Sequence, residues 1–329
     1  MDDISYQLHL AAPGGGSLRD VTQLVQSITW SGSLRQTARQ LSVRLAVPRD
    51  GSVEPPVLAE GAALVLQGEG GPLFTGQLVT ATTSTQSSVA DLGALDGGRF
   101  LAGNDGWYRF DNVTAEGAAG IAASDFGIPT GRLAATGVIL RRKFPGVALD
   151  KIITTMYSLA GEQTGKRYLL RFSGSGAMEV IEKAETASLE IAQTMGVTNT
   201  WNITDLCNSV AIYTKEGQLV RKVEDGGSQT LNGRLEHAIT QQDKEDAGPE
   251  AQAWLTDHGL QQNLTVEVLD PPISLITGEA VILRDTGSGV SGLFWVDGDT
   301  HSWKNKVHTG KFKLNFRNMM NSSSAGQEL

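Results

Sequence analysis

The chain carries Gly61-Ala-Ala-Leu-Val-Leu66 and, much later, Gly278-Glu-Ala-Val-Ile-Leu283, which share a glycine, an alanine two places on and three apolar residues. Each stretch precedes a glycine-rich turn and a second apolar run, Gly76-Gln-Leu-Val79 and Gly292-Leu-Phe-Trp-Val296 respectively. This recurrence of strand, turn and strand predicts a duplicated β-barrel-like domain. Any two hairpins bounded by glycines would look similar, so that alternative stays open.

Alternation of apolar and polar residues indicates strands on both sides of the middle of the chain. Apolar positions alternate with small or polar ones over residues 41–47, until Pro48, and again over residues 312–316. A period of two is typical of a strand with one buried face. By the same criteria, further strands are predicted over residues 61–67, 73–83, 167–172, 177–183, 210–214 and 218–223.

Helical patterns occur mainly in the middle of the chain. Thr114 is predicted to cap a short alanine-rich helix that ends near residue 125, with Ile121 facing inward. A stronger helix is predicted from Leu149, because apolar residues recur there at i, i+3, i+4 and i+7, and Gly161 is expected to end it. Pro249 is typical of the first turn of a third helix.

These patterns together predict an α+β fold dominated by antiparallel β-structure. Two similar β-barrel-like domains would flank a smaller mixed middle region. The predicted division is 1–100 for the first barrel-like domain, 101–198 for the middle region, 199–320 for the second barrel-like domain and 321–329 for a flexible tail.

Composition limits the function classes. The 329 residues carry a net charge of −9, so we expect at best weak and salt-dependent binding to nucleic acid. The single cysteine, Cys207, excludes an internal disulfide and is consistent with a reducing compartment. The N-terminus does not resemble a signal peptide, and no apolar run approaches the roughly 20 residues of a membrane-spanning helix, so no membrane insertion is expected.

One cluster of potential metal ligands lies near the C-terminus. Asp297, Asp299 and His301 alternate along a predicted strand, where they would face the same way, and His308 follows. Carboxylates and imidazoles can bind Mg²⁺, Mn²⁺ or Zn²⁺. However, Asp-Gly-Asp is common in turns, and no second group of ligands is visible, so we favour a structural role.

The remaining motifs have simpler explanations than catalysis. Gly287-Ser-Gly-Val-Ser-Gly292 matches a dinucleotide-binding pattern, but a strand follows it instead of a helix, which indicates a hairpin loop. Cys207 is interpreted as a buried thiol, and Arg141-Arg-Lys143 as a solvated turn. The carboxylates Glu182 and Glu185 cannot be distinguished from surface acids. We therefore predict no catalytic, cofactor-binding or metal-binding residue.

Tryptophans on predicted strands leave open the possibility of an aromatic binding surface. Trp30, Trp295 and Trp303 lie in or beside strands. An aromatic strip on a β surface can bind a sugar or a protein. Core packing is the commoner role of such residues and is preferred here.

Three stretches resemble a known family over the length of the chain. Ser27-Ile-Thr-Trp30-Ser-Gly-Ser-Leu-Arg-Gln36, continued by Ala38-Arg-Gln-Leu41, looks like the opening of XkdQ-like tail proteins. Leu206-Cys-Asn-Ser-Val-Ala-Ile-Tyr213 resembles the strand that reopens the second barrel in that family, and residues 292–316 resemble its closing strands. The motif residues of unknown contact are Trp30, Leu41, Asn208, Gly292, Asp299, His301 and Trp303.

The resemblance implies a structural role in a contractile phage tail or a related particle. XkdQ-like proteins are similar to the baseplate hub proteins of phage Mu and T-even phages. Such hubs are homotrimers whose six barrels join the sixfold tail tube to the threefold central spike. The implied partners are further copies of this chain, the tube protein, the spike protein and other baseplate proteins, including a LysM-type tube-hub neighbour. The implied location is the baseplate, after assembly in the host cytoplasm.

An enzymatic alternative remains at this stage. Tail tips must cross peptidoglycan, so a tail-associated cell-wall hydrolase or a peptidoglycan-binding protein is possible. The carboxylates available to such a hydrolase are those of Asp297, Asp299, Glu182 and Glu185. No catalytic residue of any family member transfers to this sequence, and we therefore prefer the structural role without a cofactor.

Overall fold

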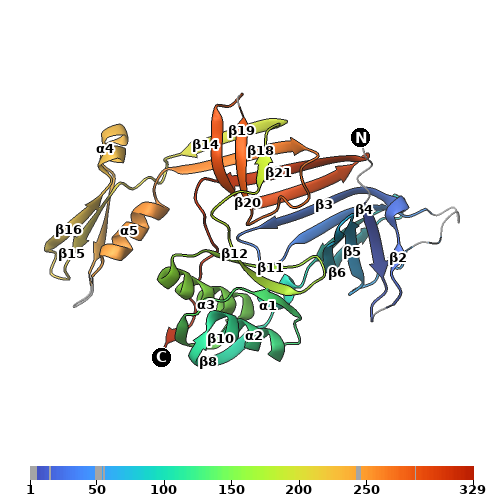
Figure 1. Ribbon diagram of the computed structural model, residues 1–329, viewed down its shortest axis with the longest axis horizontal. Helices are drawn as coiled ribbons and strands as arrows, with labels where there is room; N and C mark the ends of the chain where they lie inside the picture. The colour runs from blue at the N-terminus through green and yellow to red at the C-terminus, as the bar shows by residue number, and fades with distance from the viewer. Residues whose placement is uncertain (1–5, 15, 49–53, 55, 242–245, 286) are drawn as a thin grey trace. The chain divides into compact units, whose positions relative to one another are not determined.

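The computed structural model describes residues 6–14, 16–48, 54, 56–241, 246–285 and 287–329. The chain forms two compact units. Residues 1–197 and 265–329 make up one, called the main unit here, and residues 198–264 make up the other, called the inserted unit. Figure 1 shows the course of the chain through both. The domain boundaries expected from the sequence stay a prediction.

A large, mostly antiparallel sheet dominates the main unit. Its hydrogen-bonded order runs β18-β21-β20-β3-β4-β7-β6-β5-β1-β2, β14 follows β18, and β19 and β13 branch from β20. Its strands are β1 (Gln7–Ala11), β2 (Arg19–Asp20), β3 (Val25–Ser33), β4 (Gln40–Ala46), β5 (Ala63–Gly68), β6 (Gly71–Thr83), β7 (Val89–Leu95), β13 (Leu189–Ile191), β14 (Gly196–Asn202), β18 (Gln261–Leu269), β19 (Ala280–Asp285), β20 (Val290–Lys304) and β21 (Val307–Asn315). Most of β14 and the start of β18 belong to the residue range of the inserted unit. The 3-10 turn η1 (Thr22–Leu24) lies between β2 and β3.

Both glycine-alanine stretches open hairpins with the same local geometry. Gly61 precedes β5 at φ +76° and Gly278 precedes β19 at φ +98°, a region that glycine enters without steric cost. The residue after each glycine then accepts a hydrogen bond from the returning strand. Leu78 N–H donates to the carbonyl of Ala62 (2.8 Å), and Val296 N–H donates to the carbonyl of Glu279 (2.9 Å).

The predicted strand-turn-strand pattern is therefore confirmed at both places, and the glycine-rich motif before Gly292 lies in the β19–β20 hairpin. The fold is mostly antiparallel β and is consistent with the predicted α+β class. No closed barrel is found among the described strands, so the barrel-like form of the two β regions stays a prediction.

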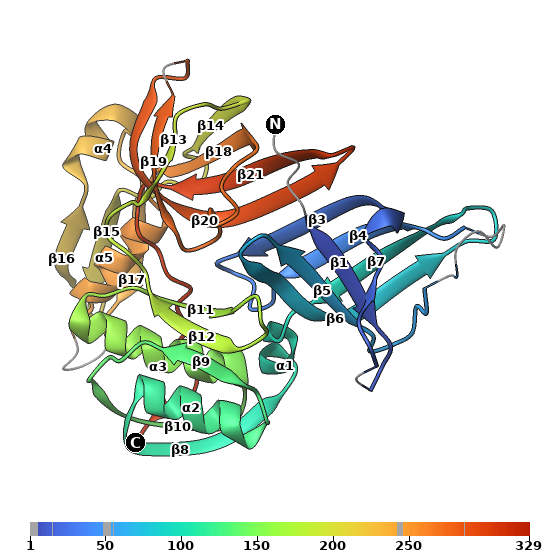
Figure 2. The same cartoon turned by 45° about the vertical axis from the view of Figure 1, so that its right-hand side comes forward.

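Strand β3, near the N-terminus, pairs directly with β20, near the C-terminus. The two strands lie side by side in both views (Figures 1 and 2). Trp303 on β20 packs in the hydrophobic core of the N-terminal strands, which includes Ile28, Leu41 and Leu45. The first and last β regions of the chain therefore share one sheet, and Trp303 joins the last region to the core of the first.

The middle region forms a lobe on two small sheets (Figure 2). One has the order β22-β10-β8 and the other β11-β12-β9. The elements are α1 (Gly98–Ala102), β8 (Asp105–Thr114), α2 (Ala115–Asp125), β9 (Thr130–Leu133), β10 (Ile139–Ala148), α3 (Leu149–Thr164), β11 (Tyr168–Phe172), β12 (Met178–Glu182) and β22 (Gln327–Glu328). The helices α2 and α3 supply much of the core, including Ala118, Ala122, Ile152, Ile153 and Met156.

Two details of the predicted helices differ from the structure. Thr114 caps α2 as predicted, because its side chain accepts a hydrogen bond from Gly117 N–H. Ile121, however, is 44% exposed, since alanines alone form the buried face of that helix. The expected end of α3 at Gly161 is also wrong. The helix continues to Thr164, and Gly165 ends it in the left-handed conformation at φ +74°.

The basic stretch and the C-terminal segment also differ from expectation. Arg141-Arg-Lys143 lies in strand β10 and is not a turn. The sequence predicts a flexible tail over residues 321–329, but β22 pairs with β10 there. Arg142 holds this segment, because its guanidinium donates to the carbonyls of Ala325 (2.7 Å) and Ser324 (3.0 Å).

The inserted unit is a small α+β structure. Strand β15 (Ser209–Tyr213) pairs antiparallel with β16 (Leu219–Glu224) and parallel with β17 (Glu236–Thr240). Helices α4 (Gly226–Asn232) and α5 (Gly248–Asp257) complete it. The hydrophobic residues Val210, Ile212, Ala251 and Leu255 form its core. Among the described residues of the chain, no helix is long and apolar enough to cross a membrane.

Candidate functional site at the β3–β20 seam

The junction of β3 and β20, called the seam here, brings most of the sequence-predicted motif residues together. Trp30 on β3 is the direct partner of His301 on β20 and of Leu41 on β4. Asp299 and Trp303 flank His301 at alternate positions, and all three side chains are buried. Sequence positions far apart therefore meet where the two β regions join.

Asp299 forms a buried ion pair across the seam. Its two carboxylate oxygens accept from Arg39, Oδ1 from Nη1 (2.9 Å) and Oδ2 from Nη2 (2.5 Å). Oδ1 also accepts from the backbone N–H (2.7 Å) and the hydroxyl (2.6 Å) of Thr277. The guanidinium lies 4.2 Å from the centre of the Trp30 ring, which adds a cation–π contact. The carboxylate is thus saturated by structural donors.

Gly32 makes room for this pair. A Cβ atom at this position would lie 2.4 Å from Arg39 Nη1 and 2.8 Å from its Cζ. Only a residue without a side chain lets the guanidinium cross β3 to reach Asp299. The sequence signal for Arg39 was weak, since it is one charged residue in a stretch recognised by family resemblance.

His301 and His308 form a buried chain of hydrogen bonds. His301 Nε2 lies 3.0 Å from the carbonyl of Leu275, and His301 Nδ1 lies 3.0 Å from His308 Nε2. His308 Nδ1 then lies 3.3 Å from a carboxylate oxygen of Asp270. Burial lowers the pKa of His301 to about 4 and also lowers the pKa of His308. Both rings are therefore neutral at neutral pH.

The number of ring protons explains the three contact distances of the His301 and His308 hydrogen bonds. Three hydrogen bonds need three ring protons, but two neutral rings carry only two. The contact between His308 and Asp270 is the longest of the three, and the Asp270 side chain is 63% exposed, so water can reach it. The two histidines thus tie β20 and β21 to the segment before β19, which is a structural task.

The predicted alignment of Asp297 with Asp299 and His301 is wrong. A register shift between Val296 and Gly298 interrupts the alternation of β20 at Asp297. The Asp297 side chain instead accepts from Asn315 (2.8 Å), and burial raises its pKa. Within the described residues there is no group of three or more His, Cys, Asp or Glu side chains that could hold a metal ion.

The other predicted site residues lie apart from the seam. Glu182, on β12, forms an ion pair with Lys166 (2.8 Å), and Glu185 accepts from Asn318 (2.8 Å). Gly292, at φ +152°, lies opposite Leu283 in the β19–β20 hairpin. Trp295 is buried, and its indole donates to the carbonyl of Ala184 (2.8 Å), so the core interpretation of the three tryptophans is confirmed.

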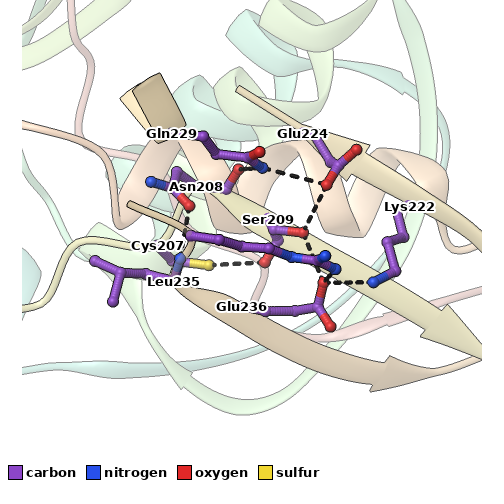
Figure 3. Close-up of polar contacts among 9 residues, drawn as sticks. Cys207, Asn208, Ser209, Lys222, Glu224, Gln229, Leu235 and Glu236 are labelled. Carbon is purple, nitrogen blue, oxygen red and sulfur yellow. Dashed lines mark hydrogen bonds and ion pairs between the residues drawn. The ribbon is translucent and has the colours of Figure 1, made fainter. Parts of the chain in front are cut away.

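Asn208 is the motif residue of the inserted unit (Figure 3). Its side chain is completely buried. Its amide donates to the carbonyl of Gly233 (2.7 Å), and its Oδ1 accepts from Leu235 N–H (2.8 Å). Asn208 thereby fixes the segment between α4 and β17 beside the start of β15. Cys207 next to it is buried and points its thiol at the carbonyl of Ser209 (3.2 Å), as expected for a structural cysteine.

A second polar cluster surrounds Ser209 in the inserted unit (Figure 3). The hydroxyl contacts Glu236 (2.8 Å) and Glu224 (3.3 Å). Lys222 (2.8 Å) and Arg234 also pair with Glu236. The hydrogen bonds from Ser209 and then Arg234 lower the pKa of Glu236. No histidine contacts Ser209 in the described structure, so this cluster lacks the base that a nucleophilic serine needs.

A cavity of about 420 Å³ lies between the seam and the β11–β12 sheet in the main unit. Its walls combine Trp30, Arg39 and Thr277 with apolar residues such as Leu169 and Ile276. Arg39 is committed to Asp299, and Arg171 is paired with Glu179 and Glu279. The charged residues that line this cavity are thus held in ion pairs.

Comparison with known proteins identifies the family. The model of the family described as YQBQ-like matches residues 28–315, which include the seam and the inserted unit. The chain belongs to the YQBQ-like family. It is 24% identical over 315 residues to the phage-like element PBSX protein XkdQ of Bacillus subtilis, covering 90% of this chain and 94% of that protein. The predicted resemblance to XkdQ-like proteins is confirmed.

The fold is shared with solved tail proteins. The 43 kDa tail protein of prophage MuSo2 from Shewanella oneidensis is similar with a TM-score of 0.71 and 14% identity, over 94% of this chain and 98% of that one. The Escherichia coli c3393 protein is similar with a TM-score of 0.52 and 10% identity, over 93% and 76%. It is a type VI secretion component with structural similarity to the T4 tail proteins gp27 and gp5. This YQBQ-like chain thus shares its family with a protein of a phage-like element, and its fold with a prophage tail protein and a type VI secretion component.

Proposed function

We propose that this chain is a baseplate hub protein that joins a sixfold tail tube to a threefold spike as a homotrimeric ring. The observation that carries the proposal is the pair of equivalent hairpins at Gly61 and Gly278, joined in one sheet through β3 and β20. The β regions around them are the two barrel-like domains of the hub. Three copies then present six such regions to the tube and keep threefold symmetry toward the spike.

The seam suits this role because it fixes the two β regions relative to each other. A ring with six quasi-equivalent positions needs each subunit to hold its two tube-facing regions at a constant angle. The buried Arg39–Asp299 pair and the shared core at Trp303 supply that rigidity. The partners of the ring are the tube protein, the spike protein and neighbouring baseplate proteins, and assembly takes place in the host cytoplasm.

The proposed role is non-enzymatic. The carboxylates that a cell-wall hydrolase could use are held in structural contacts, Asp299 by Arg39 and Thr277 and Glu182 by Lys166. We expect no clearing in zymograms of purified cell wall. Clearing by the purified chain would revive the hydrolase alternative.

Copy number tests the proposal directly. Quantitative mass spectrometry of purified tail particles should give three copies of this chain for each six-subunit ring of tube protein. Native mass spectrometry of the isolated hub should show a trimer at high concentration. Six copies per ring, or one copy in the particle, would contradict the duplicated-domain basis of the proposal.

A further inference from the structure

The outer face of the antiparallel β8–β10 pair carries an exposed strip of aromatic and cationic side chains. The inner face packs Phe110 and Phe144 on the helices of the middle lobe. The outer face has three cross-strand pairs, in order along β8: Trp107 with Pro145, Arg109 with Lys143, and Asp111 with Arg141. All six residues are exposed. In Figure 2, β8 and β10 lie at the periphery of this lobe.

The middle pair of the strip is energetically unfavourable for the isolated chain. Arg109 and Lys143 are direct neighbours on one face of an antiparallel pair, where like charges destabilise the pairing. Neither side chain forms an ion pair or hydrogen bond within the part of the chain that the structure describes. Arg141, by contrast, is paired with Asp111 at 2.8 Å. Two positive charges are thus left side by side without a counterion.

Trp107 supplies an anchor next to these charges. Its side chain is among the most exposed large hydrophobics of the described structure, at 79%. The indole lies against Gly146, whose φ is +65°, and a Cβ there would approach indole Nε1 to 3.2 Å. The indole therefore lies beside the backbone of β10 at Gly146. Exposed tryptophan beside arginine is the combination enriched at the centres of protein interfaces.

From this geometry we propose that the outer face of the antiparallel β8–β10 pair docks an acidic segment of another protein. The segment places one or two carboxylates between Arg109 and Lys143 and an apolar side chain on Trp107. A partner surface that is rich in arginine, or that is neutral, would leave the charges of Arg109 and Lys143 unpaired. Nucleic acid fits less well, because two free cations beside Asp111, on a chain of net charge −9, neutralise too few phosphates. The proposal goes beyond the hub role and does not depend on ring formation.

A labelled peptide tests the surface with the full chain. The probe is a fluorescent peptide with a Glu-Phe-Glu core, and its Lys-Phe-Lys counterpart is the negative probe. We expect salt-sensitive binding of the acidic peptide, observed by fluorescence anisotropy and by a change in tryptophan emission. The double variant Arg109→Glu/Lys143→Glu should lower the affinity at least about tenfold. Trp107→Ala should lower it several-fold without altering the salt dependence.

Lys304→Glu/Lys306→Glu is the matched control, because it makes the same change in net charge at two other exposed lysines. It should leave binding unchanged, and thermal melting should show that all variants stay folded. An equal loss of affinity in both double variants would overturn the proposal, as would no binding of the acidic peptide at low salt. Tighter binding of duplex DNA or of phosphatidylserine vesicles at the same face would also overturn it, in favour of a phosphate ligand.

Discussion

Arg39 with Asp299 in the main unit and Arg234 with Glu236 in the inserted unit are both close ion pairs, but their surroundings differ. The first pair exposes 13% and 0% of its two side chains, and the second exposes 47% and 30%. Burial removes water from the first pair, so each of its charges is stabilised mainly by the opposite charge of its partner. Solvent screens the charges of the second pair. Similar ion pairs in one chain therefore contribute differently to the free energy of unfolding. The larger contribution is expected from the buried pair at the seam.

Breaking the buried pair should have the largest effect. In Asp299→Asn the carboxylate charge is lost, and the Arg39 guanidinium stays buried without a counterion. We expect the free energy of unfolding to fall by about 3–5 kcal/mol. Urea denaturation followed by tryptophan emission would measure it. A loss below about 1 kcal/mol would mean that the seam tolerates an unpaired guanidinium, and the contrast between the pairs would disappear.

The buried histidines should add a pH dependence at the seam. The pKa of His301 is about 4 in the fold, below its ordinary value of 6.5, so the unfolded chain binds a proton first as pH falls. Stability from this group is complete above pH 6.5 and is lost toward pH 4, by up to about 3 kcal/mol. In His301→Gln this part of the pH dependence should vanish. Identical profiles of unfolding free energy for both proteins would contradict it.

Asn208 tests buried polarity in the inserted unit. Asn208→Ala leaves the Leu235 N–H and the Gly233 carbonyl without their partner, which should cost about 1–3 kcal/mol. The effect should be local. Hydrogen exchange should become faster in β15 and β17 and stay unchanged in β3 and β20. Faster exchange throughout the main unit would show that the two units unfold together.

The smallest effect is expected at the exposed pair. Glu236→Gln is the isosteric counterpart of Asp299→Asn, since both replace a paired carboxylate by an amide. Lys222 and Arg234 then lose a counterion in water, which screens them. We expect no change in unfolding free energy beyond the error of denaturation curves. A loss as large as that in Asp299→Asn would show that burial does not explain the difference.

The sequence alone determined the local structure, because local structure depends on neighbours in the chain. Periodicity of two gave β4 and β21, the hydroxyl of Thr114 gave the start of α2, and the recurring glycines gave two hairpins with the same opening geometry. Family resemblance selected Trp30, Asp299, His301 and Trp303 before any contact was known. Sequence patterns predicted less well where tertiary packing decides the structure. Gly161 was expected to end the helix, but it lies buried inside α3 against the core of the middle lobe.

Only the tertiary structure decided what those residues do. The pairing of β3 with β20 joins positions some 270 residues apart, and no periodicity encodes such a register. That pairing makes Asp299, a possible metal ligand by sequence, the partner of Arg39. The register shift at Asp297 takes the Asp297 side chain off the face that carries Asp299 and His301. The free charges of Arg109 and Lys143 likewise become neighbours only when β8 meets β10. Charge and burial depend on contacts across space, and the chain order does not contain them.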